Sequence, residues 1–134
     1  AARILRRNGI VAFPTETVCG LGADAFNPDA VAKIFAAKER PFNDPLIVHV
    51  TDKQDLLKLS VEVYKITLDL ADAFLPGPLT LVLKKSQHIP SIVTAGLETV
   101  AVRMPDHPVA LSLIRESQTP IVAPSANLFG RPQP

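Results

Sequence analysis

The sequence predicts one α/β (α+β) domain in which helices flank a twisted, open, mixed β-sheet. Short apolar runs rich in β-branched residues alternate along the chain with segments of helical periodicity, which is typical of a sheet covered by helices. The 134 residues, 47% of them hydrophobic and 20% charged, suffice for one core and not for two. A hairpin-like stretch between residues 79 and 104 favours a mixed sheet over a purely parallel one. We therefore expect a single domain over residues 1–134.

About five strands are predicted, each an apolar run bounded by glycine or proline. They occupy residues 9–14, 45–50, 79–83, 100–104 and 121–123. The prolines cannot donate to a central ladder of hydrogen bonds, so they are expected at the strand ends.

Helices are predicted where a capping residue precedes apolar positions at helical spacing. Asn27 and Pro28 open the first, Thr51 with Gln54 the second, Ser60 the third and Asp106-His107-Pro108 the last. The expected helices cover residues 28–39, 51–59, 60–74 and 106–116. The third of them carries an apolar stripe made of Val63, Ile66, Leu70 and Phe74.

Charge and composition exclude several classes of protein. The net charge is +1, so there is no global field of the kind that a dedicated nucleic-acid coat needs. The densest basic group consists of Arg3, Arg6 and Arg7, and we interpret it as a solvated helix face. No P-loop, dinucleotide fingerprint, metal-ligand spacing or nucleophile elbow is present. A single cysteine and no apolar run long enough to span a bilayer predict a cytoplasmic location.

The apolar stripe of the first predicted helix ends in a lysine. Val31, Ile34 and Phe35 are followed at helical spacing by Lys38, and Arg40 comes two residues later. In one interpretation both cations face water and complement the dipole at the helix C-terminus. In the other they form a phosphate clamp, with Lys38 a point charge and Arg40 a bidentate fork. Spacing alone leaves both interpretations open.

Two predicted strands carry a polar side chain within an apolar run. Alternation along the strand 45–50 places His49 on one face with Ile47, which predicts a half-buried histidine that is either a hydrogen-bonded core residue or a ligand. On the next-to-last strand Arg103 shares its face with Ala101. A buried arginine needs an anionic partner, and a structural carboxylate and a bound ligand are equal alternatives here.

Polar clusters at residues 14–17 and 123–127 each follow a predicted strand. In open α/β sheets, ligands bind at the edge formed by the carboxyl ends of the strands. Each cluster alone is compatible with a turn stabilised by Ser, Thr and Asn side chains. Together they indicate a site.

Five ordered segments together run over most of the chain. They are FPTETVCGLGADA at 13–25, KIFAAKERPFNDPLIVHV at 33–50, FLPGPLTLVL at 74–83, VAVRMPDHP at 100–108 and APSANLFGRP at 123–132. In this order they resemble the YrdC/Sua5 family of threonylcarbamoyl-AMP synthases. The resemblance implies a YrdC-like fold, in which the twisted sheet and its helices surround a concave cavity.

The resemblance also implies a nucleotidyltransferase. The family joins L-threonine, bicarbonate and ATP into threonylcarbamoyl-adenylate and pyrophosphate, the first step toward the t6A modification at position 37 of tRNA. Its K-x-R and S-x-N signatures fall here on the implied catalytic residues Lys38, Arg40, Ser125 and Asn127. The implied threonine-binding residues are Thr17, His49, Arg103 and Ala123. The implied ATP-binding residues are Lys38, Arg40, Asp44, Thr99, Ser125 and Gln133.

The family reaction needs no covalent enzyme intermediate, so catalysis by positioning and charge neutralisation fits the residue types. Mg²⁺ is expected to arrive on the ATP phosphates, with no metal site in the protein. The expected partners are the small-molecule substrates, the downstream t6A-transfer proteins and a weak contact with tRNA or other RNA. No membrane partner is expected.

The chain departs from the family pattern at two positions. Cys19 stands where the family usually has tyrosine, and a small core residue is the simplest interpretation of it. Asp44 stands where the family usually has asparagine, and a carboxylate near a triphosphate repels it unless Mg²⁺ or Arg40 intervenes. Family members also continue beyond the position of Pro134, so we expect a domain truncated at its C-terminus.

Two other functions stay open. An RNA-binding module is disfavoured by the low net charge and by one tyrosine and no tryptophan, because single-strand binders need basic grooves and stacking platforms. A carbamoyl-transfer relative would use carbamoyl phosphate in place of threonine and bicarbonate, and the residues on the threonine side make it the weaker choice.

Overall fold

The computed structural model describes residues 2–6, 9–14, 19–38, 45–52, 54–75 and 79–123. Its strands are β1 (Val11–Pro14), β2 (Cys19–Asp24), β3 (Ile47–His49), β4 (Leu81–Lys84), β5 (Thr99–Arg103) and β6 (Ile121–Val122). Its helices are α1 (Ala2–Arg6), α2 (Pro28–Lys38), α3 (Asp55–Leu59), α4 (Lys65–Phe74) and α5 (Pro108–Ser117).

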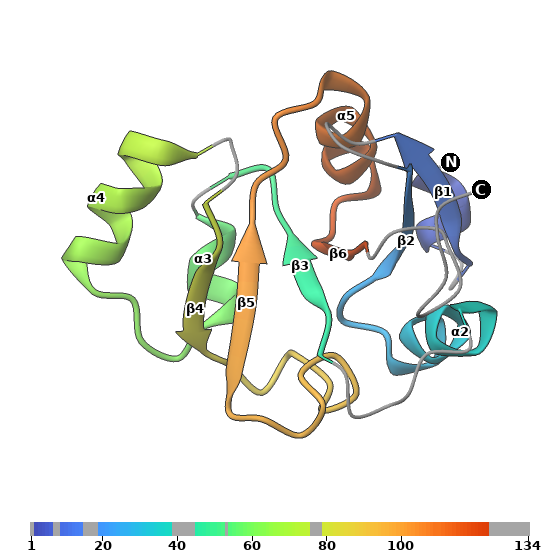
Figure 1. Ribbon diagram of the computed structural model, residues 1–134, viewed down its shortest axis with the longest axis horizontal. Helices are drawn as coiled ribbons and strands as arrows, with labels where there is room; N and C mark the ends of the chain where they lie inside the picture. The colour runs from blue at the N-terminus through green and yellow to red at the C-terminus, as the bar shows by residue number, and fades with distance from the viewer. Residues whose placement is uncertain are drawn as a thin grey trace.

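The strands within these residues form one mixed sheet in the order β1-β2-β6-β3-β5-β4 (Figure 1). The β3–β5 pair is parallel and the other pairs are antiparallel. The predicted mixed sheet flanked by helices is confirmed, and so is the hairpin-like pairing of β4 with β5.

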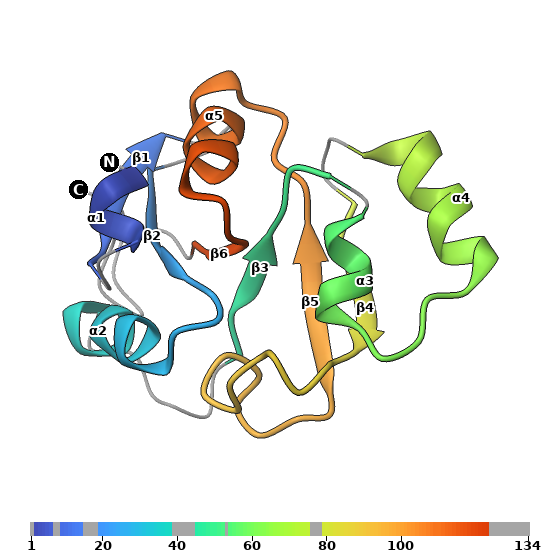
Figure 2. The same ribbon diagram turned by 180° about the vertical axis from the view of Figure 1, so that it is seen from behind.

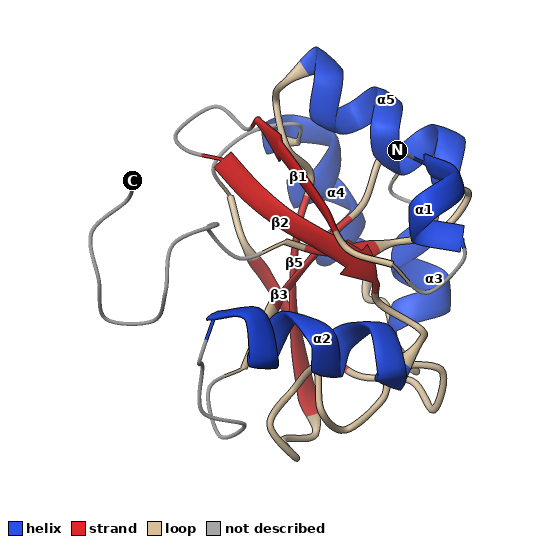
Figure 3. Ribbon diagram, turned by 90° about the vertical axis from the view of Figure 1, so that its right-hand side faces the viewer, coloured by secondary structure: helices blue, strands red, loops and turns tan. Residues whose placement is uncertain are grey.

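Two apolar clusters fill the core. The larger one joins β3 and β5 to α2 and α3, and it includes Val48, Val102, Phe35 and Leu56, all at most 1% exposed. The smaller cluster joins α1, α5 and β6 through Leu5, Ala110, Leu113, Ile114 and Ile121. Both α1 and α3 lie behind the sheet in Figure 1 and in front of it in Figure 2. Figure 3 shows α1, α3 and α5 together on one side of β1 and β2.

Local chemistry explains where the helices begin. The Oδ1 of Asn27 accepts hydrogen bonds from the backbone N–H groups of Asp29 and Ala30 at 3.0 and 3.2 Å, which caps α2 as predicted. The Nδ1 of His107 accepts from the backbone N–H of Val109 at 3.2 Å and caps α5, with Pro108 following as the first helical residue. These two helix starts therefore confirm the prediction.

The turn that leads into β1 requires a glycine. The backbone N–H of Gly9 donates to the carbonyl oxygen of Ile4 at 2.9 Å, and a Cβ on Gly9 would lie 2.9 Å from that same oxygen. A backbone oxygen of this kind cannot move aside, so a larger residue at position 9 would force α1 and β1 apart.

Strand β2 was not among the predicted strands. Its sequence, CGLGAD, contains two glycines, which lower strand propensity and read as a turn in the sequence. The structure nevertheless pairs it with β1 on one side and with β6 on the other. The sheet therefore has six strands within the described residues, where about five were expected.

Two helix starts were placed wrongly. Helix α3 begins at Asp55 with no side-chain cap, and the expected capping box of Thr51 and Gln54 does not form. Helix α4 begins at Lys65, since the hydroxyl of Ser60 bonds the backbone of Glu62 instead of capping a helix. Ser60 also forms a bridge with Lys85, which keeps the chain extended at this point.

Helix α4 exposes most of the apolar stripe that the sequence predicts. Ile66 and Phe74 are 69% and 58% exposed, and Ala71 is the buried residue of the helix. In Figure 1 the helix stands at the left, away from the other helices. No helix among the described residues combines the length and the apolar character needed to cross a membrane.

Candidate functional site

The sheet places His49 and Arg103 side by side. Strand β3 pairs with β5 in parallel register, so that Ile47 is the partner of Ala101, Val48 of Val102 and His49 of Arg103. Val48 and Val102 are fully buried in the core. Because side chains alternate along a strand, His49 and Arg103 share the opposite face and form a neighbouring pair.

His49 is more buried than the sequence predicts. Its exposed fraction is 8%, and its Nδ1 has no hydrogen-bond partner within the described part of the chain. Burial, and next the charge of Arg103, lower the pKa of His49 from 6.5 to about 4, while the backbone at Ile47 and Ile121 offsets part of this effect. The imidazole is therefore neutral at physiological pH, and it adds no positive charge beside the guanidinium.

Arg103 is held from its other side by a threonine. The Nε–H and Nη2–H of Arg103 both donate to the Oγ1 of Thr80, at 3.2 and 2.9 Å. Thr80 directly precedes β4, which pairs antiparallel with β5 so that Leu81 is the partner of Val102. One further step of this register brings Thr80 opposite Arg103. The three side chains His49, Arg103 and Thr80 thus form a row across three adjacent chain segments.

The strand directions divide the candidate residues between two edges of the sheet. Strands β1 and β6 run the same way, since both are antiparallel to β2, and β3 and β5 run opposite to them. Strands β1 and β6, which the two predicted polar clusters follow in the sequence, therefore end at the edge where β3 and β5 begin. Thr99 starts β5 at that edge, whereas His49 and Arg103 end their strands at the other.

Thr99 and Ala123 are the other predicted site residues that the structure describes. Thr99 is exposed, is the partner of Lys84, and helps to line a cavity of about 230 Å³ between β4 and α4. Ala123 is half-buried, follows β6 and packs against the smaller core cluster. Arg103 lies four residue steps beyond Thr99 on β5, which is about 13 Å along an extended strand.

The remaining predicted site residues lie outside the described part of the structure. They are Thr17, Arg40, Asp44, Ser125, Asn127 and Gln133. Lys38 is the last described residue of α2, and its side chain is not described. The side chain of Cys19, in β2, is not described either.

Thr80 is the residue that reasoning from the sequence missed. Its position within the predicted strand 79–83 was visible, but its partner was not. The connection from β4 to β5 covers residues 85–98, and a connection of this length does not fix the register of the pair.

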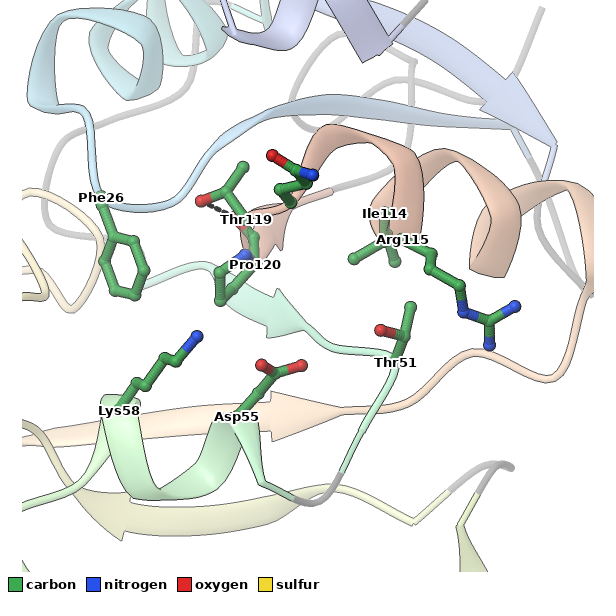
Figure 4. A pocket seen from close by; sticks show the side chains of 9 residues that line it. Phe26, Thr51, Asp55, Lys58, Ile114, Arg115, Thr119 and Pro120 are labelled. Atoms are coloured by element: carbon green, nitrogen blue, oxygen red, sulfur yellow. Dashed lines mark hydrogen bonds between the residues drawn. The ribbon is translucent and has the colours of Figure 1, made fainter.

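A separate cavity of about 260 Å³ lies between α3 and α5 (Figure 4). Lys58 and Asp55 extend into it from α3, and Thr119 and Pro120 line the opposite wall. The Oγ1 of Thr119 donates to Oδ1 of Asp24 at 2.8 Å, which ties the end of β2 to the segment before β6. None of the predicted site residues whose side chains the structure describes lines this cavity. Within the described ranges, no group of three or more His, Cys, Asp or Glu side chains is arranged to hold a metal ion.

Comparison with known proteins gives a consistent result. The family model Sua5_yciO_yrdC, described as "Telomere recombination", matches residues 3–134. A threonylcarbamoyl-AMP synthase of Bacillus subtilis (strain 168) is 58% identical over 135 residues, which cover 100% of this chain and 39% of that protein. One of Pyrococcus abyssi is 53% identical over 134 residues and is likewise covered to 39%. The chain thus spans about two-fifths of the length of these relatives.

Solved structures agree with the sequence comparison. The crystal structure of P. abyssi Sua5 complexed with L-threonine superposes with a TM-score of 0.95 at 53% identity, over 99% of this chain and 39% of that one. The crystal structure of E. coli YciO superposes with a TM-score of 0.82 at 24% identity, over 97% of this chain and 63% of that one, and so supports the fold alone.

Proposed function

The chain belongs to the Sua5/YciO/YrdC family, and from that membership we propose that the protein is an L-threonylcarbamoyladenylate synthase, a nucleotidyltransferase. Its substrates are L-threonine, bicarbonate and ATP, and its products are threonylcarbamoyl-AMP and pyrophosphate. The product supplies the threonylcarbamoyl group of t6A in tRNA, so the proteins that transfer this group are the expected downstream partners. A weak contact with tRNA and a cytoplasmic location both stay predictions.

The observation that carries the proposal is the fixed, positively charged row of Arg103, His49 and Thr80. The guanidinium is bound by a neutral hydroxyl and flanked by a neutral imidazole, so the row keeps a net positive charge. A guanidinium fork pairs with a carboxylate through two parallel hydrogen bonds. The relative that was crystallised with L-threonine is 53% identical to this chain. We assign the carboxylate of threonine to Arg103, beside His49, while Thr17 and Ala123 stay predicted threonine-binding residues.

The nucleotide is assigned to the other edge of the sheet. Thr99 begins β5 there, and Asp44 and Ser125 stay predicted nucleotide-binding residues. The separation of about 13 Å along β5 between Thr99 and Arg103 leaves room for an amino acid and a nucleotide joined end to end. Lys38 and Arg40 would neutralise the phosphates, with Ser125, Asn127 and Gln133 beside them, and Mg²⁺ would enter as part of the MgATP substrate.

The reaction has two steps, and neither needs a covalent bond between substrate and enzyme. The amine of threonine adds to the carbon of bicarbonate, and loss of water leaves a carbamate. An oxygen of the carbamate then attacks the α-phosphorus of ATP, and the bond to the β-phosphate oxygen breaks, which releases pyrophosphate. The enzyme gains rate by holding the carbamate in line with the α-phosphorus and by offsetting the charge that develops on the phosphates.

Product analysis tests the proposal. The full-length protein, incubated with ATP, L-threonine and ¹⁴C-bicarbonate, should form a labelled adenylate and one pyrophosphate for each adenylate. Omitting L-threonine should abolish both products. Adenylate that is labelled from ¹⁴C-carbamoyl phosphate, in the absence of threonine and bicarbonate, would instead indicate a carbamoyl-transfer enzyme.

A further inference from the structure

Thr80 lies opposite Arg103, and its side chain binds the guanidinium. The backbone register that pairs Leu81 with Val102 sets Thr80 directly opposite Arg103, and the side chain of Thr80 is half-buried. Its Oγ1 accepts from both Nε and Nη2 of the guanidinium, at 3.2 and 2.9 Å. A hydroxyl oxygen has two lone pairs, so these two bonds use its whole capacity as an acceptor.

The two bonds also determine which donors of Arg103 remain. A guanidinium presents five N–H groups in one plane. Thr80 occupies the edge formed by Nε–H and one Nη2–H. The end of the fork, formed by Nη1 and the second Nη2–H, has no hydrogen-bond partner among the described residues and can bind another acceptor. That end is the one that can bind both oxygens of a carboxylate at once.

We propose that Thr80 is a positioning residue for substrate binding, which fixes the plane of the Arg103 guanidinium so that the end of its fork meets the carboxylate of the amino-acid substrate. This inference rests on the proposed function, because it takes the ligand of Arg103 to be threonine. An arginine side chain loses much rotamer freedom when it is held in one geometry. The bonds to Thr80 order the side chain of Arg103 before the substrate binds, so the bond to the carboxylate forms with a smaller loss of entropy.

Neutral side chains on both sides of Arg103 leave its positive charge available to the substrate. On one side, the buried imidazole of His49 lies next to Arg103 on β3. A carboxylate at position 80 would neutralise Arg103 and compete with the substrate for it. A hydroxyl holds the fork and leaves its charge available.

The test compares Thr80→Val and Thr80→Ser in the full-length protein. Valine keeps the shape of threonine and removes the hydroxyl, whereas serine keeps the hydroxyl. We expect Thr80→Val to raise the KM for threonine about fivefold, with the KM for ATP and kcat changed less than about twofold. The Thr80→Ser variant should have a KM for threonine within about twofold of the wild-type value.

Thr119→Val is the matched control. Thr119 is also half-buried and also bonds a side chain, the carboxylate of Asp24, but it lies away from Arg103. Its valine variant should leave the KM for threonine unchanged. A Thr80→Val enzyme with an unchanged KM for threonine, or with equal rises for threonine and ATP, would overturn the proposal, and so would an equal effect of Thr119→Val.

An NMR measurement separates this proposal from the proposed function. The ¹⁵Nε–¹H signal of Arg103 should exchange slowly with water in the wild type and at least about tenfold faster in Thr80→Val, even without substrate. Equal exchange rates would mean that Thr80 does not hold the fork and would overturn the inference alone. A wild-type protein without threonine-dependent activity would overturn the proposed function and the substrate role of Thr80 with it.

Discussion

Arg103 and His49 are direct partners in the parallel pairing of β5 with β3, and the charge of the arginine helps to keep the histidine neutral. Burial is the larger cause, and together they bring the pKa of His49 to about 4. A charged imidazole here would repel the guanidinium and would be poorly solvated. The pair is therefore stable in one charge state, a neutral ring beside a cationic fork, over the physiological range of pH.

This relationship predicts that acid destabilises the protein through His49. The unfolded chain takes up a proton near pH 6.5 and the folded chain only near pH 4, so between these values the unfolded state binds more protons. The contribution to stability is complete above pH 6.5 and falls as the pH drops toward 4, by up to about 3 kcal/mol. Urea unfolding of the wild type and of His49→Gln across pH 4–7 measures it.

The His49→Gln variant should lose much less stability in that range. His88 is exposed, so His88→Gln provides a control that should follow the wild-type curve. If the wild type and His49→Gln lose stability in parallel between pH 6.5 and 4, then His49 is not the group responsible.

Arg103→Lys should raise the KM for threonine by one to two orders of magnitude. Lysine keeps the charge but cannot make two parallel hydrogen bonds, a loss of roughly 1.4 to 3 kcal/mol. The KM for ATP should change much less, because the triphosphate is assigned to other residues. Both KM values should be measured on the same folded variant. Equal increases in the KM for ATP and for threonine would indicate that Arg103 binds the nucleotide or stabilises the sheet.

Lys38→Ala should lower kcat at least about 100-fold while the thermal unfolding midpoint stays close to that of the wild type. Lys38 ends α2, beyond the buried residues Ile34 and Phe35, so its truncation should remove charge without opening the core. Steady-state kinetics and calorimetry on the same preparation measure both effects. Lys33→Ala, an exposed lysine on the same helix, serves as the control. Activity that persists while the midpoint falls by many degrees would make Lys38 a structural residue.

Phe35→Ala should cost about 3–5 kcal/mol of unfolding free energy, since the ring is 1% exposed within the larger core cluster. Phe74→Ala should cost less than about 1 kcal/mol, because that ring is 58% exposed on α4. Denaturant titration of the two variants compares them directly. Similar costs would show that α4 packs more tightly than this structure indicates.

The sequence was sufficient where one local signal decided the outcome. Asn27 with Pro28 and His107 with Pro108 open helices as predicted, because capping depends on neighbouring residues alone. It was not sufficient for β2, whose glycines suit a turn equally well and which becomes a strand only because β1 and β6 flank it. The apolar stripe of α4 followed helical spacing, but spacing does not tell whether a face is covered, and most of this one is exposed.

The candidate site was predictable in part for the same reason. Alternation placed His49 and Arg103 on strand faces, and the structure brings the two together. The depth of burial of His49 and the bond from Arg103 to Thr80 depend on the register of strands distant in the sequence, which no local pattern fixes. The roles of Arg40, Asp44, Ser125 and Asn127 stay predictions, because they lie outside the described residues.

Isotope exchange between pyrophosphate and ATP tests the central claim most directly. The full-length protein should incorporate ³²P from labelled pyrophosphate into ATP only when L-threonine and bicarbonate are both present, because the reverse step needs threonylcarbamoyl-AMP on the enzyme. Omitting either substrate should reduce the exchange to background. Exchange that persists without threonine, or no exchange together with tight and salt-sensitive binding of tRNA, would contradict the assignment.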